Sequence, residues 1–322
     1  MKAVKIVITI SMIAALLSCN REITITNSDA PKYIAFENVT TKAGLTDIQS
    51  NGFGVWALFY NEAQPSGHWL LEDRNVELKD GEWTYGTPEL WIDNSFFGFF
   101  GVYPKDTEFS SIQGERNKTV ELNYETPDDA DEDILVAISF VDTSGDFEQT
   151  VQMPFKHLFS KINIKVKQNT GTNERDNFIV DKITLKGVKG KGVCSIFVSQ
   201  EPEWTFDNST KSFTKEFSGN TPIGLKGEIL FSENGLLLIP QDITANSIEV
   251  EIAFRFGLEG NTDVSTYESK TYKAYLPPTT NWEYGKAITY TALLSTYNPI
   301  VFEAPTIESW GGSQSSGTII IK

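Results

Sequence analysis

Apolar and polar residues alternate along several stretches of the chain, which is the pattern of a β-strand with one buried face. The stretch 162–167 reads Ile-Asn-Ile-Lys-Val-Lys, and apolar residues recur at every second position from Ile248 to Phe256. Turn residues recur about every eight to twelve positions, and no window longer than about ten residues has a convincing helical period. These patterns predict an all-β protein of sandwiches or barrels.

Two further stretches, 52–60 and 96–104, are apolar at nearly every position. We read the first as a strand with both faces covered, at the centre of a sheet, and the second as a very apolar strand closed by Pro104. Other strands are predicted at 33–39, 134–141, 178–185 and 193–198. A length of 322 residues indicates two domains.

The N-terminus has the pattern of a bacterial signal peptide. Lys2 and Lys5 precede an apolar run that is too short to span a bilayer comfortably. The run ends in Leu-Ser-Cys19, which resembles a lipobox, the site where a lipoprotein is cut before the cysteine that is then acylated. We therefore predict a signal peptide at 1–18, an acyl anchor on Cys19 and a polar tether at 19–32. The alternative is an ordinary signal peptide that contains a cysteine.

The chain is strongly acidic, with 27 basic and 43 acidic residues and a net charge of −16. Removing the signal peptide takes away two more positive charges. Such a surface argues against nucleic acid and anionic lipid headgroups as partners. Cys194 is the one cysteine besides Cys19, which excludes a disulfide-built fold, and we expect it to be a small buried hydrophobe.

The sequence contains no recognisable catalytic or metal-binding motif, so we expect no enzyme, cofactor or metal. GxSxG, HExxH and CxxC are absent, and His157 is expected to pack or to form a hydrogen bond. The acidic run 128–133 fails as an EF-hand because Ile134 and Phe140 stand where Gly and Glu are required. Three tryptophans would stack on sugar rings if exposed, or would lie in the core: Trp69, Trp83 and Trp204.

Several landmarks stand in order along the chain. They are the lipobox, the loop Thr40-Thr41-Lys42-Ala43, the aromatic strand that ends in Pro104, FKHLFSKI at 155–162, LLLIPQ at 236–241 and a W-x-x-G hairpin that begins at Trp282. Together they resemble the fimbrillin family, the subunits and adhesins of type V pili. The hairpin departs from the family pattern at one aromatic position, where Ala287 or Ile288 stands in place of Tyr.

The resemblance implies two transthyretin-like Greek-key β-sandwich domains in tandem, at 33–154 and 155–322. It also implies a non-enzymatic role at the outer membrane or in the fimbrium. The implied partners are other fimbrial subunits, of the same or a related kind, and ligands on host or bacterial surfaces.

In shaft-forming fimbrillins a trypsin-like protease cuts after a basic residue in the loop that follows the first strand. Lys42 stands here where Arg is usual, so the hypothesis is a cut between Lys42 and Ala43. Release of the strand 33–39 would open a groove that a strand of the next subunit fills by β-augmentation. The implied donor lies on a Ser- and Gly-rich link and comprises Thr318, Ile319, Ile320 and Ile321. The alternatives are a tip or accessory subunit that does not polymerise, and a surface glycan-binding lipoprotein.

Overall fold

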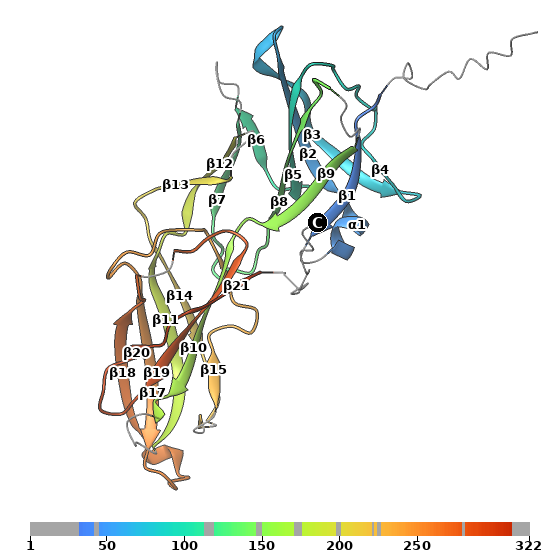
Figure 1. The fold of residues 1–322 in the computed structure, drawn as a ribbon. Helices are drawn as coiled ribbons and strands as arrows, with labels where there is room; N and C mark the ends of the chain where they lie inside the picture. The colour runs from blue at the N-terminus through green and yellow to red at the C-terminus, as the bar shows by residue number, and fades with distance from the viewer. Residues whose placement is uncertain are drawn as a thin grey trace, which may run out of the picture.

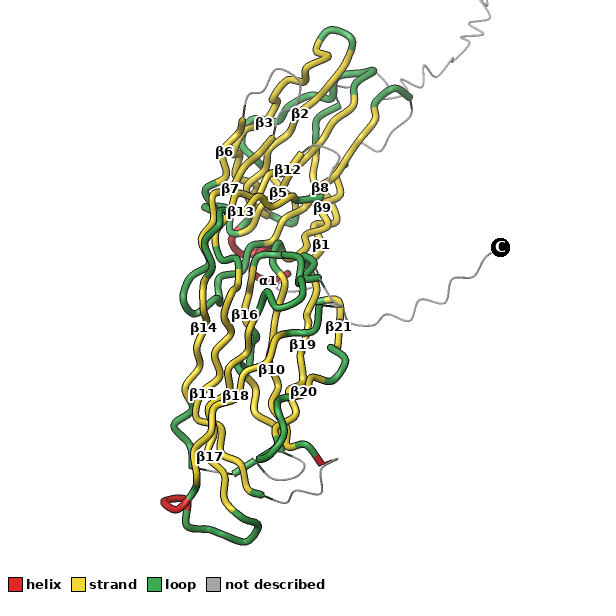
Figure 2. The backbone as a smooth tube through the Cα atoms, turned by 90° about the vertical axis from the view of Figure 1, so that its left-hand side faces the viewer, coloured by secondary structure: helices red, strands yellow, loops and turns green. Residues whose placement is uncertain are grey.

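The computed structural model describes residues 32–41, 45–112, 119–145, 150–170, 176–197, 201–220, 222–223, 227–278 and 281–310. This part of the chain is nearly all β, as predicted; its α-helix, α1 (Leu45–Asn51), is short, and a 3-10 turn lies at Val264–Thr266. The molecule is elongated (Figure 1), and most strands run along its long axis (Figure 2).

Seven strands close into a barrel at one end of the molecule (Figure 1). In order around the barrel they are β1 (Ala35–Thr41), β4 (Glu82–Thr84), β3 (Gln64–Lys79), β2 (Phe53–Asn61), β5 (Phe96–Tyr103), β8 (Leu135–Asp142) and β9 (Thr150–His157). Side chains from all of these elements line one apolar core, in which Phe53, Phe97 and Phe155 are fully or almost fully buried. Closure through β4 is narrow, because β4 pairs with β3 at three positions and with β1 at one, Phe36↔Trp83.

A second sheet covers the outer face of the barrel. It has the order β13 (Glu203–Phe206), β12 (Lys191–Phe197), β7 (Thr119–Glu125) and β6 (Phe109–Ile112). Trp56 and Leu58 of β2 pack against this sheet, whereas Val55 and Ala57 face the barrel interior. The prediction that this strand has both faces covered is therefore confirmed. Cys194 of β12 lies in the same outer core, where burial raises the pKa of its thiol far above the usual range.

The other end of the molecule is built of two sheets that share one apolar core. The first contains β15 (Glu228–Leu230), β10 (Ser160–Gln168), β19 (Lys286–Leu294) and β20 (Val301–Phe302), with β16 (Leu236–Leu238) beside β10 and β21 (Thr306–Ser309) beside β19. The second has the order β14 (Lys211–Glu216), β11 (Asn177–Val188), β17 (Glu249–Gly257) and β18 (Glu268–Tyr275). The predicted alternations in β10 and β17 are confirmed, because their apolar side chains alternate into this core.

Ion pairs lie on the outer side of the second of these sheets. Lys186 of β11 and Lys273 of β18 place their Nζ atoms 2.7 and 3.2 Å from Oε2 of Glu251 on β17. Hydrogen bonds from these two lysines hold the pKa of the Glu251 carboxyl below its usual range. The pairs tie three neighbouring strands together across the solvent-facing side of the sheet.

The hairpin of β12 and β13 follows β11 in sequence, yet it joins the sheet on the barrel. β12 is antiparallel to β7 over its whole length, from Lys191↔Glu125 to Phe197↔Thr119. β12 and β13 thus share a core with the barrel although they lie within the segment 155–322. The division of the chain into two Greek-key sandwiches at residue 155 stays a prediction, and this pairing shows that the two halves are interleaved.

Candidate functional site

The first strand, β1, lies between two different neighbours. On one side it runs parallel to β9, with Ala35 opposite Thr150 and Thr41 opposite Phe155. On the other side it pairs with β4 only at Phe36↔Trp83. The strand was predicted at 33–39 and is observed two residues later.

The residues just before β1 are held by the segment that follows β4. The backbone N–H of Ile34 donates to the carbonyl of Glu89 at 2.8 Å, and that of Trp91 donates to the carbonyl of Lys32 at 2.9 Å. The buried Tyr85 hydroxyl donates to the Ile34 carbonyl at 2.8 Å and accepts from the Glu89 N–H at 3.1 Å. Burial raises the pKa of Tyr85, so its hydroxyl stays a neutral donor at this position.

Three side chains of this segment point into the barrel. Ile34, Phe36 and Val39 are 2%, 3% and 6% exposed. Without these residues the barrel would have an apolar groove with unpaired backbone groups along β9 and along 85–91, which is costly in water. Ile34 to Val39 therefore form a plug that the barrel needs; below we call the space they occupy the first-strand groove.

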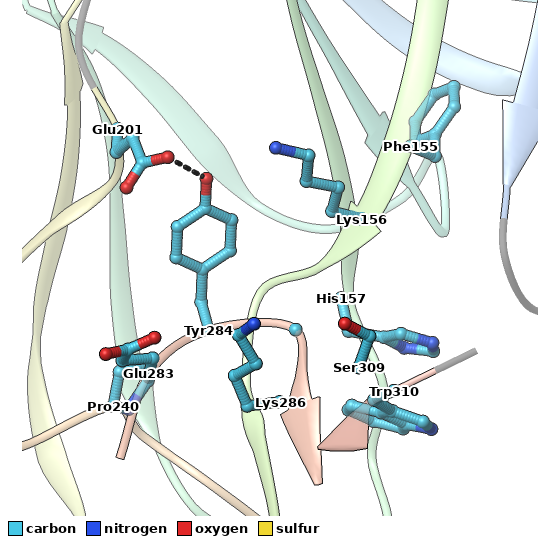
Figure 3. A pocket seen from close by; sticks show the side chains of 11 residues that line it. Phe155, Lys156, His157, Glu201, Pro240, Glu283, Tyr284, Lys286, Ser309 and Trp310 are labelled. Carbon is cyan, nitrogen blue, oxygen red and sulfur yellow. Dashed lines mark hydrogen bonds between the residues drawn. The ribbon is translucent and has the colours of Figure 1, made fainter. Parts of the chain in front are cut away.

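A cleft of about 420 Å³ lies at the junction between β9 of the barrel and the strands β19 and β21 (Figure 3). Tyr284 stands on one side of it, and its hydroxyl donates to Glu201 Oε1 at 2.7 Å. Burial, and then this hydrogen bond, raise the pKa of Tyr284 well above its usual range. Lys156 and Lys286 also line the cleft (Figure 3), with the Lys156 Nζ 5.7 Å from the Tyr284 ring centroid.

His157 and Trp310 form the other wall of the cleft (Figure 3). Their rings stack with centroids 3.4 Å apart and an interplanar angle of 8°. The His157 Nδ1 lies 2.9 and 3.1 Å from the two carboxylate oxygens of Asp133. The backbone N–H of Trp310 donates to the carbonyl of Gly285 at 2.9 Å. The expectation that His157 packs and hydrogen-bonds is confirmed, but its tryptophan partner was not predicted, because the two residues are far apart in the sequence.

The site residues that the sequence predicts lie outside the described residues: Cys19, Lys42, Ala43, and Thr318, Ile319, Ile320 and Ile321. Each therefore stays a prediction. Lys42 directly follows β1, which ends at Thr41.

Other candidates from the sequence fall within the described part of the chain. No cluster of metal ligands occurs there, and Asp128 of the acidic run instead pairs with Lys211 at 2.7 Å. Trp69, Trp83 and Trp204 pack against the apolar cores, which favours their core role over an exposed sugar-stacking platform. None of the helices in the described ranges is long and apolar enough to cross a membrane.

The profile of the fimbrillin-like family matches residues 41–310, so the chain belongs to this family of fimbrial subunits and adhesins. The family points to a structural role at the cell surface, in contact with other fimbrial subunits. No protein of curated function matches the chain significantly.

Two solved structures of fimbrial proteins resemble the chain, and the first of the two shows the same fold. A fimbrial protein from Bacteroides vulgatus is 17% identical, with a TM-score of 0.64 over 86% of this chain and 99% of that one. The tip fimbrial protein Mfa3 from Porphyromonas gingivalis, solved with a C-terminal truncation, is 10% identical, with a TM-score of 0.37 over 86% of this chain and 99% of that one.

Proposed function

We propose that this chain is a non-enzymatic fimbrial subunit that assembles by strand exchange. In this proposal the chain is lipid-anchored at the outer membrane through Cys19 and is then cut between Lys42 and Ala43. The segment up to Lys42 leaves, and a strand of another subunit fills the first-strand groove. The run Thr318–Ile321 is the strand that this chain offers in return.

One observation carries the proposal: β1 is a plug with a single covalent tie to the barrel. Its side chains and the residues just before it occupy the groove, and its chain connection to the rest of the barrel runs only through residues 42–44. One cut at that place separates the whole plug covalently. The plug nevertheless keeps its hydrogen bonds and buried side chains, so an incoming strand has to replace it rather than enter an empty site.

Limited digestion of purified residues 20–322 with a trypsin-like protease tests this proposal. The expected product is a stable fragment that begins at Ala43 and forms a ladder of multimers on a non-boiled denaturing gel. The Lys42→Ala variant is the matched control, because it removes this cut and leaves the other basic residues in place. Deletion of 317–322 should abolish the ladder without changing the cut.

Other outcomes would redirect the function. A chain that is cut at Ala43 but stays monomeric would indicate a tip or accessory subunit. A chain that is nicked at random or not at all would favour a surface glycan-binding lipoprotein, which a screen against polysaccharides would detect. The lipid anchor is tested separately in cells, where labelled palmitate should enter the wild-type protein and not the Cys19→Ala variant.

A further inference from the structure

The cleft between β9, β19 and β21 is lined by charged groups of both signs that do not neutralise one another (Figure 3). Lys156 and Lys286 bring ammonium groups to its lining, and Glu201 and Glu283 bring carboxylates. Within the described residues no ion pair involves any of these four side chains. Donors and acceptors of the cleft are therefore available to a ligand.

A ligand with several hydroxyl groups matches this mixture better than an ion does. An ammonium group only donates hydrogen bonds and a carboxylate only accepts them, whereas a hydroxyl group does both. An anion attracted by the two lysines would also approach the two glutamates, and a cation attracted by the glutamates would approach the lysines, so the charges of the cleft largely cancel for either ion. A neutral polyhydroxyl ligand can accept from the lysines and donate to the carboxylates.

The ring of Tyr284 gives the cleft an aromatic face. The residue is partly exposed, and the hydrogen bond of its hydroxyl to Glu201 Oε1, at 2.7 Å, holds the ring in place. The apolar C–H face of a sugar ring can pack against such a face. The Lys156 Nζ lies 5.7 Å from the ring centroid, which puts it within hydrogen-bonding reach of the hydroxyl groups of a sugar lying on the ring.

Contacts within the protein already fix the opposite wall. The Trp310 ring is stacked on His157, and the backbone N–H of Trp310 donates to the carbonyl of Gly285, the residue after Tyr284. The two walls are thus tied together through the backbone, which lowers the entropy that a ligand loses on binding. The volume of about 420 Å³ lies within the range of about 300–1,000 Å³ that is usual for small-ligand sites.

We propose that this cleft binds a neutral saccharide, with one sugar ring against Tyr284 and hydroxyl groups on the lysines and glutamates that line it. The site adds an adhesive function to the proposed fimbrial subunit and does not depend on strand exchange. The sequence pointed to three tryptophans as stacking residues, but these pack against the cores, and the ring that the cleft offers is a tyrosine.

A printed array of oligosaccharides tests the proposal with the uncut chain 20–322, labelled with a fluorophore. The array carries neutral oligosaccharides of hexoses and N-acetylhexosamines, and beside them the same glycans with sialic acid or sulfate added. At least one neutral glycan should bind, and its negatively charged counterparts should not bind more tightly. The Kd of the most tightly bound neutral glycan is then measured by calorimetry for the wild-type chain and its variants.

Tyr284→Ala should weaken binding at least about 10-fold, because the ring face is lost. Lys156→Ala should weaken it about 10-fold through the loss of a charged donor, and this exposed residue carries the test if Tyr284→Ala does not fold. The matched control is Tyr297→Ala. Tyr297 is 74% exposed, lies beyond the far end of β19 and also has a lysine beside its ring, with the Lys270 Nζ 5.3 Å from the centroid. This variant should leave the Kd unchanged.

Three results would overturn the proposal. The first is the absence of binding to every neutral glycan on the array. The second is binding that neither Tyr284→Ala nor Lys156→Ala weakens, because the site would then lie elsewhere. The third is tighter binding of the sialylated or sulfated glycans, which would make the ligand an anion. None of these results bears on the proposed assembly, which the cut between Lys42 and Ala43 and the multimer ladder decide.

Discussion

The substitution Phe36→Ala measures how much the first strand contributes to the free energy of unfolding of the barrel. The ring is 3% exposed, and three other rings surround it edge-on. Truncation of a buried Phe to Ala costs about 3–5 kcal/mol, since the apolar contacts are lost and a cavity remains. Each edge-to-face pair contributes about 0.5–1.5 kcal/mol beyond its buried area, so we expect a value near the upper end, about 4 kcal/mol.

The assay is a urea series on residues 20–322, with unfolding of the barrel read by hydrogen exchange at the amides of β2 and β9. The matched control is Phe140→Ala on β8. This ring is 42% exposed and stacks on Phe96 on the outside of the barrel, with centroids 5.8 Å apart. The control should cost about 1 kcal/mol or less, because its ring remains largely in water in the folded state.

A cost below about 1.5 kcal/mol for Phe36→Ala would contradict the reasoning. It would mean that the first strand is not part of the cooperative barrel and that its groove closes or fills without it. The strand would then leave unaided, and an exchange that depends on an incoming strand would lose its physical basis.

Four shorter predictions follow from other parts of the structure. Gly187→Ala should destabilise the fold by about 1–3 kcal/mol more than Gly81→Ala, in urea titrations, because both residues have φ near +87° but only at Gly187 would a Cβ lie 2.4 Å from a backbone oxygen. Cys194 should not react with a thiol reagent until the chain 20–322 unfolds, since the thiol is buried and its pKa is raised. The stabilising effect of Glu251 over Gln should be present above pH 4.5, the ordinary pKa of the carboxyl, and should vanish as the pH falls through its lower folded-state pKa. Trp310→Ala should speed hydrogen exchange in β21 by about 5- to 10-fold, because the stack on histidine is lost.

The hydrophobic pattern predicts the strands that have either one buried face or two. Alternation in β17 follows from one buried face, and the dense apolar run of β2 follows from two covered faces. Both features are local, because each residue's burial depends on the face of the strand from which it projects. The short helix α1 escaped prediction because its seven residues are too few for a helical period to emerge.

The features that shape the candidate site depend on contacts between distant parts of the chain. The pairing of β12 with β7 joins residues about seventy positions apart, and no local pattern distinguishes it from pairing within one half. β1 has one residue more than β9 between Glu37 and Thr40. This bulge depends on the register of the two strands, which a shift of one residue would change. The stack of Trp310 on His157 is set by the way β21 adds to β19.

β9 connects the first-strand groove with the place where the tail begins, and a mechanical force on assembled subunits would act at both. Residues 150–155 of this strand form one wall of the first-strand groove, and His157 at its end holds Trp310, the last described residue before the tail. If an incoming strand occupies the groove while the tail is held by another subunit, tension enters along the first six residues of β9 and leaves at its end. An extended strand is nearly at its maximum length and resists stretching. The load is then shared by backbone hydrogen bonds in shear along β9, by the pairing of β21 with β19 and by the His157–Trp310 stack.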